Sequence, residues 1–93
     1  PGVFALHQNY PNPFNPVTTI RYDVPEQAHV TMEIYNLLGQ KVATLVNGIQ
    51  EPGYHAIMWN GTNMSGAAMS SGMYFYHIQA GDFRSVKKLI LVK

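Results

Sequence analysis

The chain has 93 residues, of which 46% are hydrophobic and only 12% are charged, with no cysteine and a formal net charge of +1. This length suits one domain, since single domains cluster near ~100–150 residues. The lack of cysteine excludes a disulfide framework and any thiolate metal site. A net charge of +1 gives no electrostatic basis for nucleic-acid binding. No signal-like segment follows Pro1, and no apolar run approaches the ~20 residues that span a bilayer, so we interpret the chain as a piece of a larger protein.

Short segments rich in Val, Ile, Thr, Tyr and Phe lie between prolines and glycines, which is the pattern of strands separated by turns. No long helical pattern alternates with them, which disfavours a parallel sheet. The residues alone therefore predict an all-β sandwich or small barrel of about seven strands. In chain order the expected strands are 3–8, 19–24, 30–34, 41–46, 54–59, 73–80 and 83–93, the first and fourth having the weaker patterns.

One segment is ambiguous, because residues 26–38 also place apolar side chains at helical spacing. We favour a strand there, since Met32 joins Val30 and Ile34 on one alternating face. Gly81 predicts a tight hairpin turn between the last two strands, because glycine supplies the positive φ that such turns need. The alternation predicts a core made of Ile20, Tyr22, Val24, Val30, Met32, Ile34, Val42, Trp59, Tyr74, Tyr76, Ile78, Ile90 and Val92.

No catalytic or metal site is predicted. The four histidines fall on separate predicted strands without paired spacing, so surface histidine is the simpler interpretation, and no serine lies in a nucleophile-elbow pattern. The loop 60–66 superficially resembles a calcium loop, but it carries amides and hydroxyls where carboxylates are needed. Tyr74, Phe75 and Tyr76 could stack on a sugar, although alternating aromatics also fill the core of a sandwich. We expect a protein that is not an enzyme and binds no cofactor.

The charges are unevenly distributed. Four of the six basic residues, Arg84, Lys87, Lys88 and Lys93, fall in the last ten positions, and no acid accompanies them. A basic β-forming end could be an edge strand that its lysines protect from aggregation. It could equally be a recognition strand displayed for pairing or for an acidic receptor. The residues alone leave both interpretations open.

Several motifs together resemble a known family. Residues 6–16 (LHQNYPNPFNP) resemble the opening of the type A C-terminal sorting domain of the type IX secretion system, a family similar to the Ig-like domain of the flagellar hook-capping protein. The resemblance continues through 35–40, 52–55, 59–61, 71–74 and 87–93, and it covers essentially the whole chain. Asn60 and Asn63 depart from the family, which is often acidic at both positions.

The resemblance implies a seven-stranded antiparallel Ig-like (fibronectin III-like) sandwich over 1–93, with an opening strand and proline-rich motif at 1–16 and a basic terminal strand at 84–93. It implies a cargo domain linked upstream, transit through the periplasm, and recognition by an outer-membrane type IX translocon and its sorting peptidase. The protein would then be secreted or held at the cell surface of a gram-negative bacterium. The expected recognition residues are Lys87, Lys88, Leu89, Ile90, Leu91, Val92 and Lys93, and the expected motif residues are Tyr10, Pro11, Asn12, Pro13, Phe14, Gly39, Trp59, Gly72 and Tyr74.

The proline-rich motif has its own chemistry. Its prolines fix φ and remove amide donors, so the segment cannot join the interior of a sheet. Asn12 and Asn15 can cap its turns, and we expect Tyr10 and Phe14 to pin it to the sandwich. It could be a stiff lid over one end of the core or an epitope for a receptor.

The alternative function for the whole chain is an Ig-like accessory module of a modular extracellular enzyme, acting as a polysaccharide-binding unit or a spacer.

Overall fold

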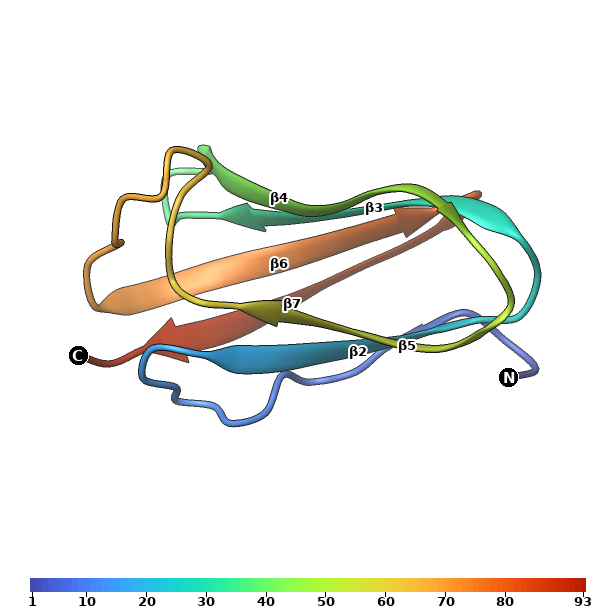
Figure 1. Cartoon of the computed structure of the whole chain (residues 1–93), viewed down its shortest axis with the longest axis horizontal. Helices are drawn as coiled ribbons and strands as arrows, with labels where there is room; N and C mark the ends of the chain where they lie inside the picture. Colours follow the sequence, from blue (N-terminus) through green and yellow to red (C-terminus); the bar gives the residue numbers. More distant parts are fainter.

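Two antiparallel sheets packed face to face form the structure (Figure 1), a computed structural model that describes residues 1–93. One sheet has three strands in the order β1-β2-β5, and the other has four in the order β4-β3-β6-β7. The predicted all-β sandwich of seven antiparallel strands is confirmed. The strands are β1 (Ala5–Leu6), β2 (Thr18–Val24), β3 (Ala28–Tyr35), β4 (Lys41–Gln50), β5 (Gly53–Trp59), β6 (Gly72–Ala80) and β7 (Phe83–Leu91).

The strand interpretation of residues 30–34 is confirmed, since β3 lies between β4 and β6 in the larger sheet. The predicted hairpin is also present: β6 and β7 are joined by a tight turn in which Gly81 has a φ of +58°. The first strand is shorter than expected, and beyond it only separate backbone bonds, from His7 to Arg21 and between Tyr10 and Thr19, continue the pairing with β2. The structure contains no helix long and apolar enough to cross a membrane.

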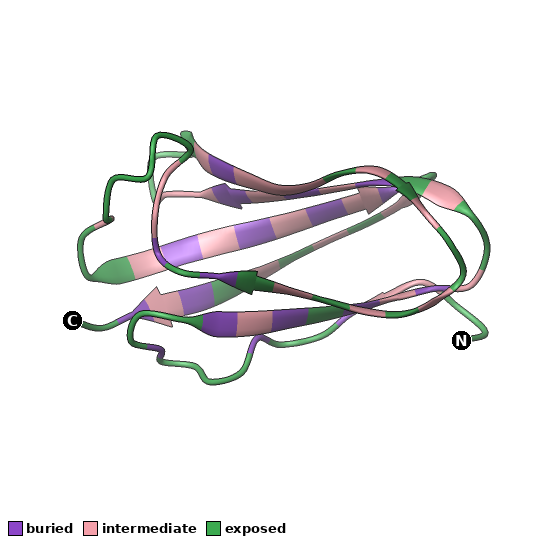
Figure 2. Ribbon diagram, in the orientation of Figure 1, coloured by how far each residue is buried: buried purple, intermediate pink, exposed green.

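The core lies between the sheets and follows the alternation of the strands (Figure 2). Along β6, Tyr74, Tyr76 and Ile78 point inward and are buried, while the residues between them are only partly covered. Burial of such side chains removes apolar surface from water at about 25 cal/mol per Å², which is the main term that holds the sheets together. The cluster comprises Leu6, Phe14, Ile20, Tyr22, Val24, Val30, Met32, Ile34, Ala43, Trp59, Tyr74, Tyr76, Ile78, Ala80, Leu89 and Leu91.

The predicted core is wrong in the last strand. Leu89 and Leu91 are buried, whereas Ile90 is only partly covered and Val92 is exposed. The register explains this result, because β7 places Leu89 opposite the inward-facing Tyr74. Four consecutive apolar residues show no alternation, so the pattern could not indicate which of them face inward. Val42 was also predicted in the core, but it packs against the cluster from a half-buried position.

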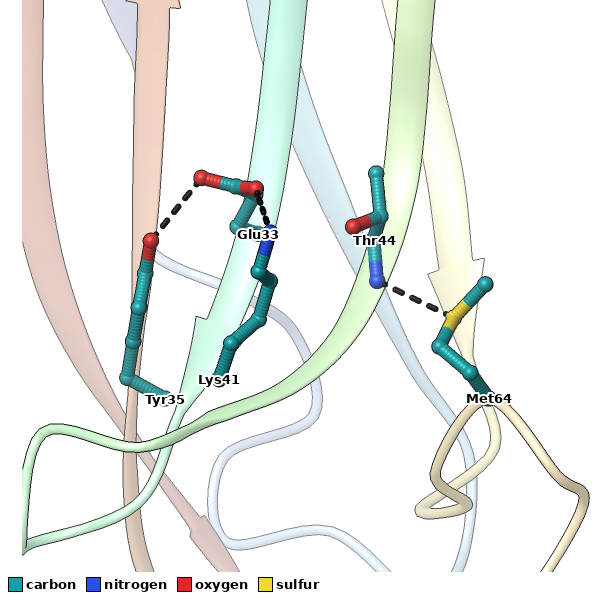
Figure 3. Close-up of polar contacts among 5 residues, drawn as sticks. All are labelled: Glu33, Tyr35, Lys41, Thr44 and Met64. Atoms are coloured by element: carbon teal, nitrogen blue, oxygen red, sulfur yellow. Dashed lines mark hydrogen bonds and ion pairs between the residues drawn. The ribbon is translucent and has the colours of Figure 1, made fainter.

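The outer face of the larger sheet carries a small polar cluster (Figure 3). Lys41 Nζ donates to Glu33 Oε2 at 2.9 Å, and the Tyr35 hydroxyl donates to Glu33 Oε1 at 2.9 Å. The hydrogen bond from Lys41, aided by the one from Tyr35, lowers the pKa of Glu33, although partial burial opposes the shift. The same bond raises the pKa of Lys41. The cluster therefore links β3 to the start of β4 through a charge-assisted contact.

The change Glu33→Gln is expected to lower the melting temperature at neutral pH and to have no effect in strong acid. Because the pKa of Glu33 is held below its ordinary 4.5, its contribution to stability is present above pH 4.5 and is lost as the pH falls through the lowered pKa. The raised pKa of Lys41 sets the other limit, so this contribution is present below pH 10.5 and is lost as the pH rises further. Thermal melts of both proteins across this range test the prediction. Glu26→Gln is the control, because Glu26 is exposed and forms no ion pair; equal losses for the two variants at neutral pH would contradict it.

Candidate recognition site

The predicted recognition segment, residues 87–93, comprises the last part of β7, the edge strand of the four-stranded sheet, and the two residues after it. Its side chains divide between two faces. Leu89 and Leu91 are 0% and 1% exposed and form part of the core. The alternation places Lys88, Ile90 and Val92 on the opposite, solvent-facing side. The structure therefore separates this segment into two leucines that hold the fold and other side chains that a partner can reach.

The basic residues of the terminal strand are free of acidic partners. Arg84, Lys88 and Lys93 are exposed, and Lys87 is half-buried at the sheet edge. The two ion pairs of the chain, His7–Asp23 and Lys41–Glu33, lie elsewhere. The terminal strand thus presents uncompensated positive charge, which attracts an acidic partner.

Residues 8–14, which we call the strap, run beside the last part of β7. Asn12 Oδ1 accepts a hydrogen bond from the Ile90 amide at 3.0 Å, and the Phe14 amide donates to the Ile90 carbonyl at 2.9 Å. The Val92 amide then donates to the Phe14 carbonyl at 2.9 Å. Asn12 therefore caps the edge of the terminal strand rather than a turn of its own loop. The strap occupies the edge that another strand would otherwise use.

A buried polar network holds the start of the strap. The Tyr76 hydroxyl donates to the His7 carbonyl at 2.7 Å and accepts from the Asn9 amide at 2.9 Å. Burial raises the pKa of Tyr76 to about 12, so the hydroxyl keeps its proton at physiological pH. The Asn9 side chain donates to Thr18 Oγ1 at 2.9 Å and to the Pro11 carbonyl at 3.2 Å. Sequence reasoning did not single out Asn9, and its only signal was its place inside the proline-rich motif.

An aromatic cluster fixes the other end of the strap. Phe14 is buried, with its ring centroid 5.7 Å from that of Trp59. Tyr74 meets Trp59 edge-on at 5.5 Å, and its hydroxyl donates to the Ser70 carbonyl at 2.7 Å. Trp59 Nε1 donates to the Thr62 carbonyl at 2.9 Å. These contacts place Phe14, Trp59 and Tyr74 in one unit that seals the end of the core nearest the C-terminus.

The remaining motif residues do not gather at one place. The Tyr10 side chain is 76% exposed, so the expectation that it pins the loop is wrong; its backbone instead pairs with Thr19. Pro11 and Pro13 are exposed on the strap. Gly39 closes the turn after β3 with a φ of +80°, a backbone conformation that favours glycine. Gly72 starts β6.

The histidines lie apart and join no cluster of three or more potential metal ligands. His7 Nε2 is 3.0 Å from Asp23 Oδ1 on the outer face of the smaller sheet. His55 stacks on the ring of Tyr22 with centroids 5.2 Å apart. His55 is half-buried, and its Nε2 also lies 2.7 Å from the Glu51 carbonyl oxygen.

In the loop 60–66, the side-chain oxygens face donors of the loop itself. Asn63 Oδ1 accepts hydrogen bonds from the Ser65 amide, the Ser65 hydroxyl and the Ala67 amide. Asn60 Oδ1 accepts from the Thr62 hydroxyl at 2.6 Å. These side-chain oxygens stabilise the turns of the loop.

Comparisons with known proteins identify relatives of this chain. Residues 8–93 match the family model described as the secretion system C-terminal sorting domain. No curated protein matches the sequence significantly. The structure is similar to part of dimeric latent PorU from Porphyromonas gingivalis, with a TM-score of 0.77 and 24% identity over 97% of this chain and 9% of that one.

Two further solved structures share the fold. PorZ, described as an essential surface component of the type-IX secretion system of Porphyromonas gingivalis, gives a TM-score of 0.66 at 19% identity over 96% of this chain and 12% of its own. FlgD from P. aeruginosa gives a TM-score of 0.62 at 24% identity over 80% of this chain and 57% of its own. The chain thus spans a small part of PorU and PorZ and just over half of FlgD.

Proposed function

We propose, on the premise that this chain belongs to the family of secretion system C-terminal sorting domains, that it directs a covalently linked upstream cargo across the outer membrane through the type IX system. The observation that carries the proposal is the family match over residues 8–93, which includes both the strap and the terminal strand. Members of this family act as sorting signals of secreted or surface proteins. We propose that residues 1–93 act together as one such signal and carry out no catalysis of their own.

The finer steps follow from this role. The cargo would pass through the periplasm before the domain meets the outer-membrane translocon, and a sorting peptidase would act at the junction between cargo and domain. The chain ends suit recognition while the cargo is still attached, because the N- and C-termini lie at opposite ends of the long axis (Figure 1). A cargo joined at the N-terminus therefore leaves the C-terminal tip of the sandwich accessible.

We propose that the reachable side chains of residues 87–93 are what the secretion machinery recognises. Lys88 and Lys93 are exposed and unpaired, and they flank the solvent-facing Ile90 and Val92. Leu89 and Leu91 contribute indirectly, because their burial holds the strand in place. Recognition in this form requires a folded domain rather than an extended tail.

The experiment is a reporter fusion in a gram-negative host that has a type IX system. A periplasmic reporter that carries the 93 residues at its C-terminus is expected outside the cell, and the reporter alone is expected in the periplasm. The variant Lys88→Gln with Lys93→Gln should remain folded and return most of the reporter to the periplasm. The measurement is the fraction of reporter activity in medium and on the cell surface against that in the periplasm.

A matched control separates the position of the charge from its amount. Ile49→Glu with Tyr54→Glu lowers the net charge by the same two units as the lysine variant, and both side chains are exposed on β4 and β5, neither of which neighbours β7. This control should be exported normally. Equal export of both double variants would show that the terminal lysines are not recognised.

A further inference from the structure

The outer edge of β7 is divided into a covered half and an open half. Ala80 and Phe83 form the pair next to the tight turn, and the register continues without a shift to Gly72 and Leu91. In an antiparallel ladder, alternate residues direct their amide and carbonyl groups toward the partner strand. The amide and carbonyl of Ile90 bind the strap and therefore point away from β6. The other even-numbered residues of β7 must direct their backbone groups to the same side.

The covered half begins at the Lys88 carbonyl. Gln8 Nε2 donates to that carbonyl at 2.8 Å, and the strap binds the outward amide and carbonyl of Ile90 and the amide of Val92. Before this point no hydrogen bond occupies the outward amide and carbonyl of Arg84, those of Val86, or the Lys88 amide. Residues 84–88 are therefore an open sheet edge, which we call the open edge.

The two edges of the larger sheet are protected in different ways. Native proteins protect sheet edges with bulges, prolines or covering segments. β4, at the other edge of the same sheet, has two register irregularities, and the Thr44 amide donates to Met64 Sδ at 3.2 Å (Figure 3). The open edge has no bulge, proline or covering segment, and its protection consists of the charged side chains that flank Val86. Its exposed side chains are those of Arg84, Val86 (58% exposed) and Lys88.

The charges decide which strand can pair there. A second copy paired antiparallel about Val86 would set Arg84 of one chain opposite Lys88 of the other, and a parallel pairing would set each cation against a cation. Directly opposed side chains lie about 5 Å apart, where like charges are destabilising. An extended segment with carboxylates opposite Arg84 and Lys88 and an apolar residue opposite Val86 meets favourable partners at every position.

We propose that the open edge binds an extended acidic segment of a partner protein as an added strand. The proposal deepens the proposed function and rests on it, since it assigns a binding mode to the terminal strand that sorting requires. Backbone hydrogen bonds supply the affinity in this mode and alternate side chains supply the specificity. An anionic surface offers charge without a peptide backbone, so it cannot satisfy the free amides in register.

The first test uses the 93-residue chain and a blocked peptide of sequence TETVTET, with TKTVTKT as the control peptide. Titration of the isotope-labelled chain by NMR is expected to shift the amides of residues 84, 86 and 88 and to slow their hydrogen exchange. Val86→Pro removes the outward amide and leaves the bonds to β6 in place, and it should weaken binding by about tenfold or more. Val86→Thr keeps the amide and should bind like the unchanged chain.

A charge swap tests the same binding mode even if the proline variant fails to fold. Arg84→Glu with Lys88→Glu should prefer TKTVTKT over TETVTET, which reverses the preference of the unchanged chain. Equal binding of TETVTET by Val86→Pro and Val86→Thr, or shifts centred elsewhere, would overturn the proposal and indicate simple charge attraction.

The reporter fusion separates this proposal from the proposed function. A folded Val86→Pro fusion should stay in the periplasm while the Val86→Thr fusion is exported. Export of both would overturn the role of the open edge and leave the sorting function standing. Failure of the unchanged fusion to leave the cell would overturn the sorting function itself, whatever the peptides bind.

Discussion

Removal of residues 88–93 is expected to unfold the domain. The deletion takes away Leu89 and Leu91, which are 0% and 1% exposed, together with the pairing of this half of β7 to β6. Truncation of one buried leucine costs about 2–5 kcal/mol, and the whole free energy of unfolding of a small domain is only about 5–15 kcal/mol. Phe14 and Asn12 also lose their backbone partners on the deleted strand. Circular dichroism and the dispersion of the NMR spectrum measure the outcome.

A shorter deletion provides the control. Removal of Val92 and Lys93 alone takes away two exposed residues and two hydrogen bonds, from the Val92 amide to the Phe14 carbonyl and from the Lys93 amide to the Ser71 hydroxyl. That chain should still fold cooperatively. Cooperative unfolding of the longer deletion at nearly unchanged stability would contradict the assignment of the two leucines to the core. Loss of export after the longer deletion therefore reports unfolding, and the lysine substitutions are the proper test of recognition.

Trp59→Ala is expected to lower the free energy of unfolding by about 3–5 kcal/mol, the range found for large aromatic side chains in cores. Trp59 is 2% exposed, and its ring meets Phe14 at 5.7 Å and Tyr74 at 5.5 Å. The change also leaves the Thr62 carbonyl without the indole donor. The strap should loosen as well, because Phe14 loses the ring against which it packs.

Chemical denaturation followed by circular dichroism measures this loss, since the substitution removes the only tryptophan of the chain. Met58→Ala is the matched control, because Met58 is the preceding residue of the same strand and is exposed. The control should change stability by less than about 0.5 kcal/mol. A loss below about 1 kcal/mol for Trp59→Ala would mean that the aromatic unit does not hold the sandwich together.

Local patterns in the sequence were enough to predict the strands and most of the core. Ile20, Tyr22 and Val24 alternate with polar residues, and all three are buried. Such alternation follows from the period of two along a strand, so it needs no knowledge of the partner strands. Which residues of the last strand face the core could not be read from its own sequence pattern. Counting from the turn at Gly81 sets Leu89 opposite Tyr74, so the register of the hairpin contained the answer that the apolar run did not.

The contacts of the strap could not be predicted from local patterns. Asn12 and Ile90 are 78 positions apart, and nothing near either residue indicates that they meet. The direction of the Tyr10 side chain depends on the path of the loop, which the prolines stiffen without defining. The open edge depends on which strand ends the sheet and where the strap begins to cover it, and both are properties of the assembled fold. The basic character of that strand, in contrast, was plain in the sequence.

The fusion of the 93 residues to a periplasmic reporter tests the central claim most directly, because it asks whether the chain is sufficient to sort a cargo. Most of the reporter should reach the medium or the cell surface in a host with a type IX system and stay in the periplasm when the chain is absent. Lys88→Gln with Lys93→Gln should retain it in the periplasm despite normal folding. A reporter that carries the unchanged, folded chain and still remains in the periplasm would contradict the account.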